Sequence, residues 1–322
     1  MNPKHLEIKR KHHHVWADYL LRWSEDGRNV YHNTPSGKIK CDSVRGIGME
    51  VDFYKTCHLS DYDVAVILQW SSPADEDLQR AHRSYLNDFL KLQKAAELYK
   101  KTGHKDDVIE KTLKALESNL MENLHSSHER EASLALSKLA EGNLPILYEK
   151  NDFLSFVTFL GHQFTRTKNF KTRVFEKFVI ESPDAEDFIG SMKKSWWFLS
   201  YIFGMNLGRE LFLFRSKYTH TLLENNTASP FITSDQPAIN IHKQAWDSRG
   251  LAPDFLDLYY PVSPKFAYVV SQSDEYSGGV SQITEEKATE VNLKMAIRAK
   301  SLIVGATQHS LEPLLKVIGK IA

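Results

Sequence analysis

Three consecutive histidines, His12, His13 and His14, follow the basic residues 9–11 near the start of the chain. A segment of large apolar residues comes directly after them. Because histidine changes charge near neutral pH, an imidazole at the entry to an apolar segment suits general acid-base work or metal ligation. The competing interpretation is a solvated basic run on the surface.

A second histidine group, His125, His128 and Glu129, has some likeness to a zinc-binding helix. Its order is H-x-x-H-E and not H-E-x-x-H, so the glutamate does not lie between the two histidines. With 14 histidines in the chain such coincidences are expected, and we predict a solvated helix face here. The sequence also lacks a glycine-rich phosphate loop, a dinucleotide fingerprint and a G-x-S-x-G elbow, which argues against the common nucleotide enzymes.

The composition is that of a globular protein with no charge of one sign over the whole molecule. Of the 322 residues, 42% are hydrophobic and 25% charged, with 41 basic and 41 acidic side chains. We expect one domain over residues 1–322, and any attraction to nucleic acid must be local. No apolar run approaches the ~18 residues of a membrane span, and Cys41 and Cys57 match no zinc spacing. These features predict a soluble, cytoplasmic protein with reduced thiols.

The elements that must position the polar residues change type along the chain. Apolar spacing of three and four predicts helices from about residue 61 to 206. Short runs with a period of two predict strands in a sheet-rich part over residues 209–305, to which N-terminal strands at residues 29–55 are attached. The predicted class is therefore α+β, with a mostly helical middle, short antiparallel strands near the N-terminus and an antiparallel sheet in the C-terminal third.

Individual elements follow from the same patterns. The expected helices are 12–24, a leucine-striped helix within 106–141, one from Asp152, one through 192–203 and a closing helix at 284–300. The expected strands are 29–32, 38–41, 50–55, 211–214, 230–233, 258–262 and 266–270. An apolar run at 301–305 follows the closing helix, and a last helical stretch is expected from Ser310. The leucine stripe, which we expect to face the core, is formed by Ile109, Leu113, Leu116, Leu120 and Leu124.

Several blocks resemble the bacterial family catalogued as domain of unknown function 4238. Residues 13–23 resemble its H-h-V-P-x-x-Y-L opening, residues 109–117 its pair of glutamates on a middle helix, and residues 159–173 its Q-x-x-R-T-P-x-x-R stretch. Residues 231–237 are similar to its F-x-T-S-D-N-P signature and residues 260–264 to its P-L-S-P strand. The chain departs from the family at Trp16 and Lys168, where proline is usual. The resemblance implies a set of positions and no established reaction.

Helix geometry relates some of these positions to one another. Gln163 lies at the edge of the apolar stripe of its helix, and Arg166, three residues later, is expected to lie on the same side. His162 points away from the stripe and is expected to be solvated. Glu110 and Glu117, seven apart, lie on one flank of the leucine stripe. One interpretation is a structural ion pair between Glu117 and Arg166, since an unpaired charge at the core border is unfavourable.

The functional interpretation is that His13, Glu117, Gln163, Arg166 and Asp235 meet in a cleft between the helices and the sheet. Asp235 follows a predicted strand end, where Ser234 and Asp235 serve either the local backbone or the cleft. Five basic residues lie within twelve positions, at 166, 168, 171, 173 and 177. They predict a locally positive opening to the cleft. A solvated basic face balanced by the acids at 181–187 is the alternative.

Two functions fit these residues. The first is a phosphodiester-cleaving hydrolase acting on RNA or a nucleotide, with His13 as acid-base and Glu117 or Asp235 as the second acid-base or a ligand of a divalent metal. Its substrate would be held by Gln163, Arg166, Arg173 and Ser234, with the two arginines as phosphate clamps. The second is a module that binds a nucleotide, nucleic acid or protein through the same cleft without catalysis. Neither function requires a membrane, and the sequence leaves the metal ligands and the oligomeric state open.

Overall fold

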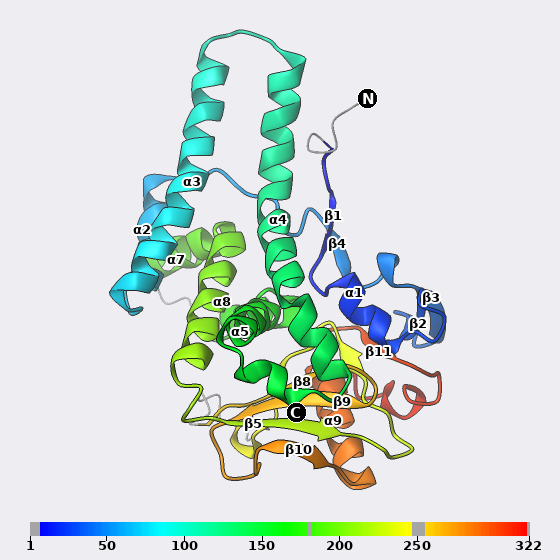
Figure 1. Cartoon of the computed structure of the whole chain (residues 1–322). Coiled ribbons are helices and arrows are strands. Elements are labelled where there is room, and N and C mark those ends of the chain that lie inside the picture. Colours follow the sequence, from blue (N-terminus) through cyan, green and yellow to red (C-terminus); the bar gives the residue numbers. More distant parts are fainter. Residues whose placement is uncertain (1–6, 179–181, 247–254, 321–322) are drawn as a thin grey trace.

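The computed structural model describes residues 7–178, 182–246 and 255–320 (Figure 1). The fold is α+β, as the sequence predicts, with helices in the middle of the chain and strands near both ends. The helices are α1 (Ala17–Leu20), α2 (Asp61–Ser71), α3 (Glu76–Lys101), α4 (Asp107–Ala140), α5 (Lys150–Thr165), α6 (Lys168–Glu176), α7 (Pro183–Lys194), α8 (Trp196–Leu213) and α9 (Glu285–Arg298).

Most of these helices begin at a residue whose side chain caps the first turn. Asp75, Asp106 and Thr167 accept hydrogen bonds from main-chain N–H groups at the starts of α3, α4 and α6. Ser60 and Asp63 form a reciprocal capping box at the start of α2. Such caps satisfy N–H groups that have no partner inside the helix and so fix where each helix starts.

The strands form three sheets. A ribbon pairs β1 (Lys11–His13) with β4 (Met49–Val51), and a four-stranded sheet has the order β3 (Ile39–Ser43), β2 (Asn29–Asn33), β11 (Ile303–Gly305), β6 (Thr233–Ser234). The five-stranded sheet has the order β10 (Gly279–Gln282), β5 (Thr219–Glu224), β9 (Phe266–Ser271), β8 (Asp257–Pro261), β7 (Ile239–Asn240). Its pairs are antiparallel except for β10 with β5, which are parallel.

Four predicted elements are wrong, and one of them is the strand at 230–233, because β6 covers only Thr233–Ser234. Residues 12–24 do not form one helix, because His12 and His13 pair with β4 and only the later part is helical. Residues 211–214 are the end of α8 and its cap, not a strand. The expected helix through 192–203 is two helices, α7 and α8, separated at Ser195. For residues 211–214 the short apolar run is compatible with a strand and with a helix, so tertiary packing decides between them.

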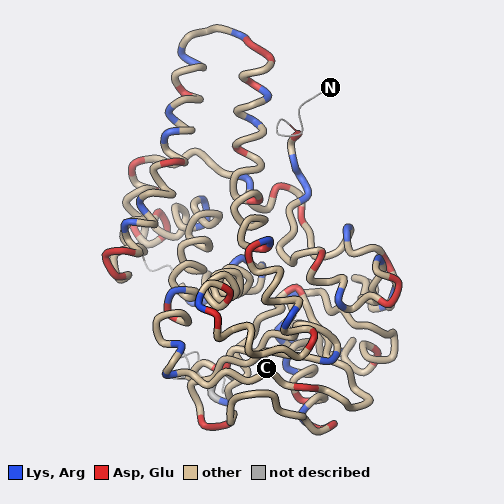
Figure 2. The backbone as a smooth tube through the Cα atoms, viewed as in Figure 1, with Lys and Arg blue, Asp and Glu red and all other residues tan. Residues whose placement is uncertain are grey.

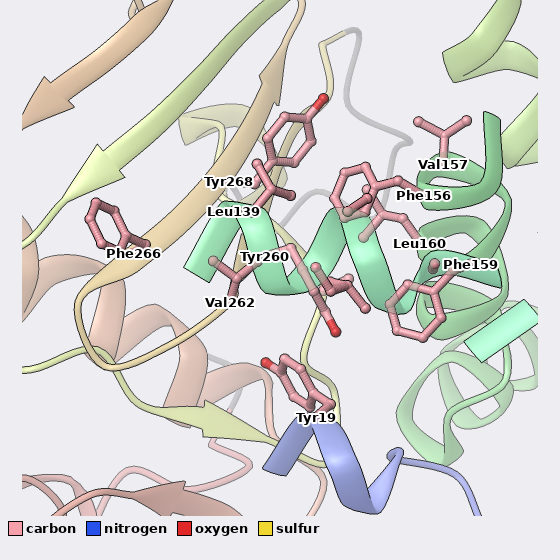
Figure 3. Close-up of a cluster of buried hydrophobic side chains, with 14 of the residues drawn as sticks. Tyr19, Leu139, Phe156, Val157, Phe159, Leu160, Tyr260, Val262, Phe266 and Tyr268 are labelled. Atoms are coloured by element: carbon pink, nitrogen blue, oxygen red, sulfur yellow. The ribbon is translucent and has the colours of Figure 1, made fainter. Parts of the chain in front are cut away.

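The main core lies between α4, α5 and the five-stranded sheet (Figure 3). Tyr19 of α1 stacks on Tyr260 of β8, and its hydroxyl donates to the carbonyl of Pro261 at 2.8 Å. Phe156 of α5 packs against Tyr268 of β9. This core fixes α4 and α5 against the sheet and so determines which of their residues face each other.

Helices α5 and α8 approach each other at glycines. A Cβ atom on Gly161 would overlap the carbonyl of Gly204 and lie 2.8 Å from the nitrogen of Gly208. Only glycine permits this backbone contact. The contact places the end of α5, with His162, Gln163 and Arg166, between α4 and α8. Among the described residues, no helix combines the length and apolar composition needed to span a bilayer.

Candidate active site

A buried group of charged and polar side chains lies where α4, α5 and the β1–β4 ribbon meet. Its centre is Arg166, at the end of α5, whose side chain is only 2% exposed. The guanidinium donates to Glu129 of α4 at 2.8 Å and to the side-chain oxygen of Gln163 at 2.6 Å. Gln163 in turn donates to the carbonyl of His14 at 3.0 Å. Burial opposes the charge on Arg166, but Glu129 keeps its pKa above the ordinary value.

Glu122 lies on the same helix as Glu129 and has a different environment. Burial raises the pKa of its carboxyl to about 7, while the charge of Arg166 and a hydrogen bond from the main chain of His13 oppose that rise. Its Oε2 atom is buried and has no hydrogen-bond partner among the described residues. A carboxyl with this pKa exchanges protons near neutral pH, which is what a general acid or base requires.

His13 contributes an imidazole to this group. Burial is the main cause of its lowered pKa, and the charge of Arg166 adds to it. The ring hydrogen-bonds to the main chain of Arg45, and its buried Nε2 atom has no partner among the described residues. His12 differs, because its Nδ1 accepts from the main chain of Tyr54 at 2.8 Å and its Nε2 bonds the carbonyl of Lys9 at 2.7 Å. His12 is thus occupied structurally, whereas His13 has a nitrogen available.

A stack of neutral histidines lies behind Glu122. The rings of His128 and His162 stack with centroids 4.6 Å apart, and His162 stacks on Tyr201 at 4.4 Å. Burial lowers the pKa values of His125 and His162 well below the ordinary value. The predictions of a solvated face at His125, His128 and Glu129, and of a solvated His162, are therefore wrong. Packing of α5 and α8 against α4 covers this face.

The structure brings together three of the residues predicted from the sequence, His13, Gln163 and Arg166. It does not bring Glu117 to them. Glu117 is exposed, lies 3.6 Å from the Nζ atom of Lys55, and makes no pair with Arg166. The predicted Glu117–Arg166 ion pair is wrong, because the face of α4 that meets α5 carries Glu122, His125 and Glu129.

Asp235 is buried but bonds to another part of the chain. Its carboxylate accepts from the main-chain N–H groups of Lys300, Ser301 and Leu302 at 2.7, 2.8 and 3.1 Å. This is the local backbone role that the sequence left as one of two interpretations. Ser234 is similarly occupied, since its hydroxyl accepts from the main chain of Gln236 at 3.1 Å and contacts the sulfur of Met295.

Arg173 lies on α6, two turns beyond Arg166. It is half-buried, and burial lowers its pKa. Its Nη1 atom has no partner among the described residues, and the side chain borders pockets between α6 and the end of α9 rather than the group around Arg166. The two arginines therefore do not converge on one phosphate.

Sequence reasoning missed Glu122 and placed Glu129 on a solvated face, and these two residues form the acidic part of the group. They lie seven residues apart, the same spacing as Glu110 and Glu117, so a pair with the expected spacing occurs twelve residues later on the same helix. The signal that identifies them is their spacing from His125, three before and four after, which puts all three on one face. Within the described ranges, no group of three or more His, Cys, Asp or Glu side chains has a metal-binding arrangement.

A pocket of about 450 Å³ lies next to the buried group. Lys168, Lys171 and Lys300 line it together with Phe53, Tyr54 and Trp196. Lys168 forms an ion pair with Glu50, also in the lining. The ring of Tyr54 separates the pocket from His125, with centroids 4.7 Å apart. Lysines beside aromatic rings are the side chains that bind phosphates and stack on bases.

Comparison with protein families supports the resemblance. Residues 204–309 match the model of the family described as "Protein of unknown function (DUF4238)", which supports the resemblance indicated by the motifs at 231–237 and 260–264. The matched segment runs from the second half of α8 through the five-stranded sheet and α9 to β11. No curated protein and no solved structure matches the chain.

Proposed function

We propose that this protein is a phosphodiester-cleaving hydrolase acting on RNA or a nucleotide, with Glu122 and His13 as its proton-transfer groups. The observation that carries the proposal is the Glu122 carboxyl. Its pKa is about 7, it interacts with the charge of Arg166 and with the main chain of His13, and its Oε2 atom has no partner among the described residues. A buried carboxyl with a perturbed pKa next to a fixed positive charge is typical of catalytic sites.

The opposite pKa shifts of the two groups assign their roles. At neutral pH the His13 imidazole is neutral and accepts a proton from the attacking water or ribose hydroxyl. A large fraction of Glu122 is protonated at this pH and donates its proton to the leaving oxygen as the P–O bond breaks. Arg166, held by Glu129 and Gln163, stabilises negative charge that develops on the phosphoryl group.

The lysine-rich pocket supplies the substrate-binding surface in this proposal. Lys168, Lys171 and Lys300 neutralise phosphates, and Phe53 and Trp196 provide rings for base stacking. The Tyr54 ring lies between this pocket and His125, so a substrate reaches Glu122 only when Tyr54 moves or when the chain passes around it. The same observation favours the second function, a module that binds a nucleotide or nucleic acid in the pocket without cleaving it.

A comparison of two glutamates on α4 tests the proposal. The purified chain is incubated with single-stranded RNA and with nucleotide phosphodiesters, with and without Mg²⁺, and products are resolved by chromatography. We expect Glu122→Gln and His13→Ala to lower turnover at least 10²-fold, the usual contribution of one acid-base group. Glu117→Gln, five residues earlier on the same helix, is expected to retain turnover.

Other outcomes assign the function differently. If Glu117→Gln loses turnover and Glu122→Gln retains it, the proton-transfer role belongs to Glu117 and not to Glu122. RNA binding that is weakened by Lys168→Glu and by salt, with no cleavage in the wild-type protein, would establish the binding module instead. A wild-type protein that neither binds nor cleaves these substrates would refute both functions.

A further inference from the structure

The upper halves of α3 and α4 form a hairpin that projects from the rest of the molecule (Figure 1). Residues 102–106 connect the two helices. At its tip the hydroxyl of Tyr99 donates to the carbonyl of Asp106 at 3.2 Å and accepts from its N–H at 2.6 Å. Both hydrogen bonds join α3 to the start of α4, so the hairpin has a defined geometry.

Apolar residues follow both helices with a spacing of three and four. On α3 they are Phe89, Leu92, Ala96 and Tyr99, and on α4 they are Ile109, Leu113, Leu116 and Leu120. This spacing is the seam of a coiled coil or four-helix bundle. On α4 the stripe was expected to face the core, yet Ile109 is 40% and Leu116 is 38% exposed. The seam is therefore incompletely covered within one chain.

A groove lies between the two helices along the length of the hairpin. Its volume is about 420 Å³, and its apolar lining includes Leu92, Ala96 and Tyr99 of α3, Leu113 of α4 and Trp197 of α8. A solvent-exposed groove of this kind between two seams leaves apolar surface in contact with water. An occupant that presents a matching seam would remove that surface from water.

The charges on the hairpin are self-complementary (Figure 2). Residues 88–101 of α3 carry four lysines and two acids, whereas residues 106–117 carry four acids and two lysines. The ion pairs of this region are local to one helix, such as Lys114 with Glu110, or reach other segments, such as Glu117 with Lys55. Among the described residues, no ion pair joins α3 to α4.

We infer that the hairpin is a dimerisation element and that its occupant is a second copy of this chain. In the dimer, α3 of one chain lies beside α4 of the other, and the four seams form the core of a four-helix bundle. A two-fold axis along the hairpin places the basic part of α3 at the same height as the acidic part of the partner α4. The same patch then serves both chains, as a symmetric interface requires.

Paired substitutions on the seam test the interface. Ile109→Glu with Leu116→Glu places two charges in the proposed core on residues that are already exposed in one chain. We expect the wild-type protein to be a dimer at micromolar concentration by light scattering and sedimentation, and this variant to be a monomer with unchanged circular dichroism. Leu134→Glu is the matched control, since Leu134 is 52% exposed on the same helix outside the hairpin.

Charge exchange tests the partner. In one variant, Lys100→Glu and Lys101→Glu make both helices acidic, and in the other, Asp107→Lys and Glu110→Lys make both basic. Each variant alone is expected to be at least tenfold weaker as a dimer, because like charges then face each other. An equimolar mixture is expected to form heterodimers with near wild-type affinity, since opposite charges again meet on both sides of the axis.

The proposal has clear contrary results. A wild-type protein that stays monomeric at 100-fold higher concentration, on the order of hundreds of micromolar, would overturn it. A dimer that Ile109→Glu with Leu116→Glu leaves intact would place the interface elsewhere. Failure of the two charge variants to form heterodimers would exclude the pairing of α3 with the partner α4.

Discussion

Helices usually bury their apolar side chains and expose their polar ones, and α4 departs from this distribution in both of its halves. The outer half, in the hairpin, exposes the apolar residues Ile109 and Leu116. The inner half, against α5 and the β1–β4 ribbon, buries the polar residues His125 and Glu129. Exposed apolar surface and buried charge are both unfavourable for an isolated chain.

The unsatisfied groups differ in kind between the two halves of this helix. In the outer half the missing contacts are apolar, which calls for another protein surface. Around the inner half the unsatisfied groups are polar, since among the described residues atoms of Glu122, His125 and Arg166 have no hydrogen-bond partner, and water or a polar ligand would satisfy them.

The largest effect is expected from breaking the ion pair of the inner half. Arg166→Ala leaves Glu129 buried without its partner and is expected to lower the free energy of unfolding by about 3–5 kcal/mol, measured in urea. The exposed pair of Arg80 with Asp77 supplies the control, and Arg80→Ala should change the free energy by less than about 1 kcal/mol. If the double variant Arg166→Met with Glu129→Leu regains the unfolding free energy, the loss in Arg166→Ala comes from the unpaired charge of Glu129.

Glu122→Gln is expected to stabilise the protein while removing turnover. Because the folded pKa of about 7 exceeds the unfolded value, the folded state binds more protons between the two values, and stability is lost as pH rises through 7. Glutamine does not ionise, so the unfolding free energy of the variant should exceed that of the wild type by on the order of 2–3 kcal/mol at pH 8 and by little at pH 4. A variant that is less stable at pH 8 would indicate a structural role for this carboxyl.

Acid should destabilise the histidine stack of the inner half. Burial lowers the pKa of His162 in the folded state, so the unfolded chain binds more protons and stability falls as pH drops below about 6.5. His162→Phe keeps a ring against Tyr201 and removes this titration. The slope of unfolding free energy against pH should become shallower by about 1.4 kcal/mol per unit in that window, and an unchanged slope would assign the acid sensitivity to other groups.

Asp235 offers a buried carboxylate whose oxygens are satisfied, in contrast to Glu122. Asp235→Asn replaces one acceptor oxygen with an amide that faces main-chain N–H groups, so we expect a loss of about 1–2 kcal/mol in unfolding free energy. Turnover and ligand binding at saturating substrate should be retained. Lost activity with normal stability would restore Asp235 to the active site.

The smallest effect on stability is expected in the outer half. Ile109→Glu with Leu116→Glu changes residues that are already exposed, so the unfolding free energy of the monomer should change by less than about 0.5 kcal/mol per site. Measurement at a concentration below the dimer dissociation constant separates this value from the contribution of association. A larger loss would mean that the stripe packs within one chain.

Much of the fold was predictable because local periodicity reports it. The helical middle, the strands at both ends and the closing helix α9 follow from apolar spacing, and His13, Gln163 and Arg166 were found from their positions in motif blocks. The errors concern residues whose neighbours come from distant segments. His12 and His13 form a strand because β4 pairs with them, and residues 211–214 stay helical because α8 continues against α5.

The sequence by itself determined the α+β class, the helical middle of the chain and the seven-residue spacing of both glutamate pairs. Only the tertiary structure decided which pair is buried and which leucines are exposed. The physical reason is that a helix presents residues on all sides, and its sequence does not state which side another element will cover. Packing of α5 against α4 places Arg166 against Glu129, and that arrangement decides which polar residues are brought together.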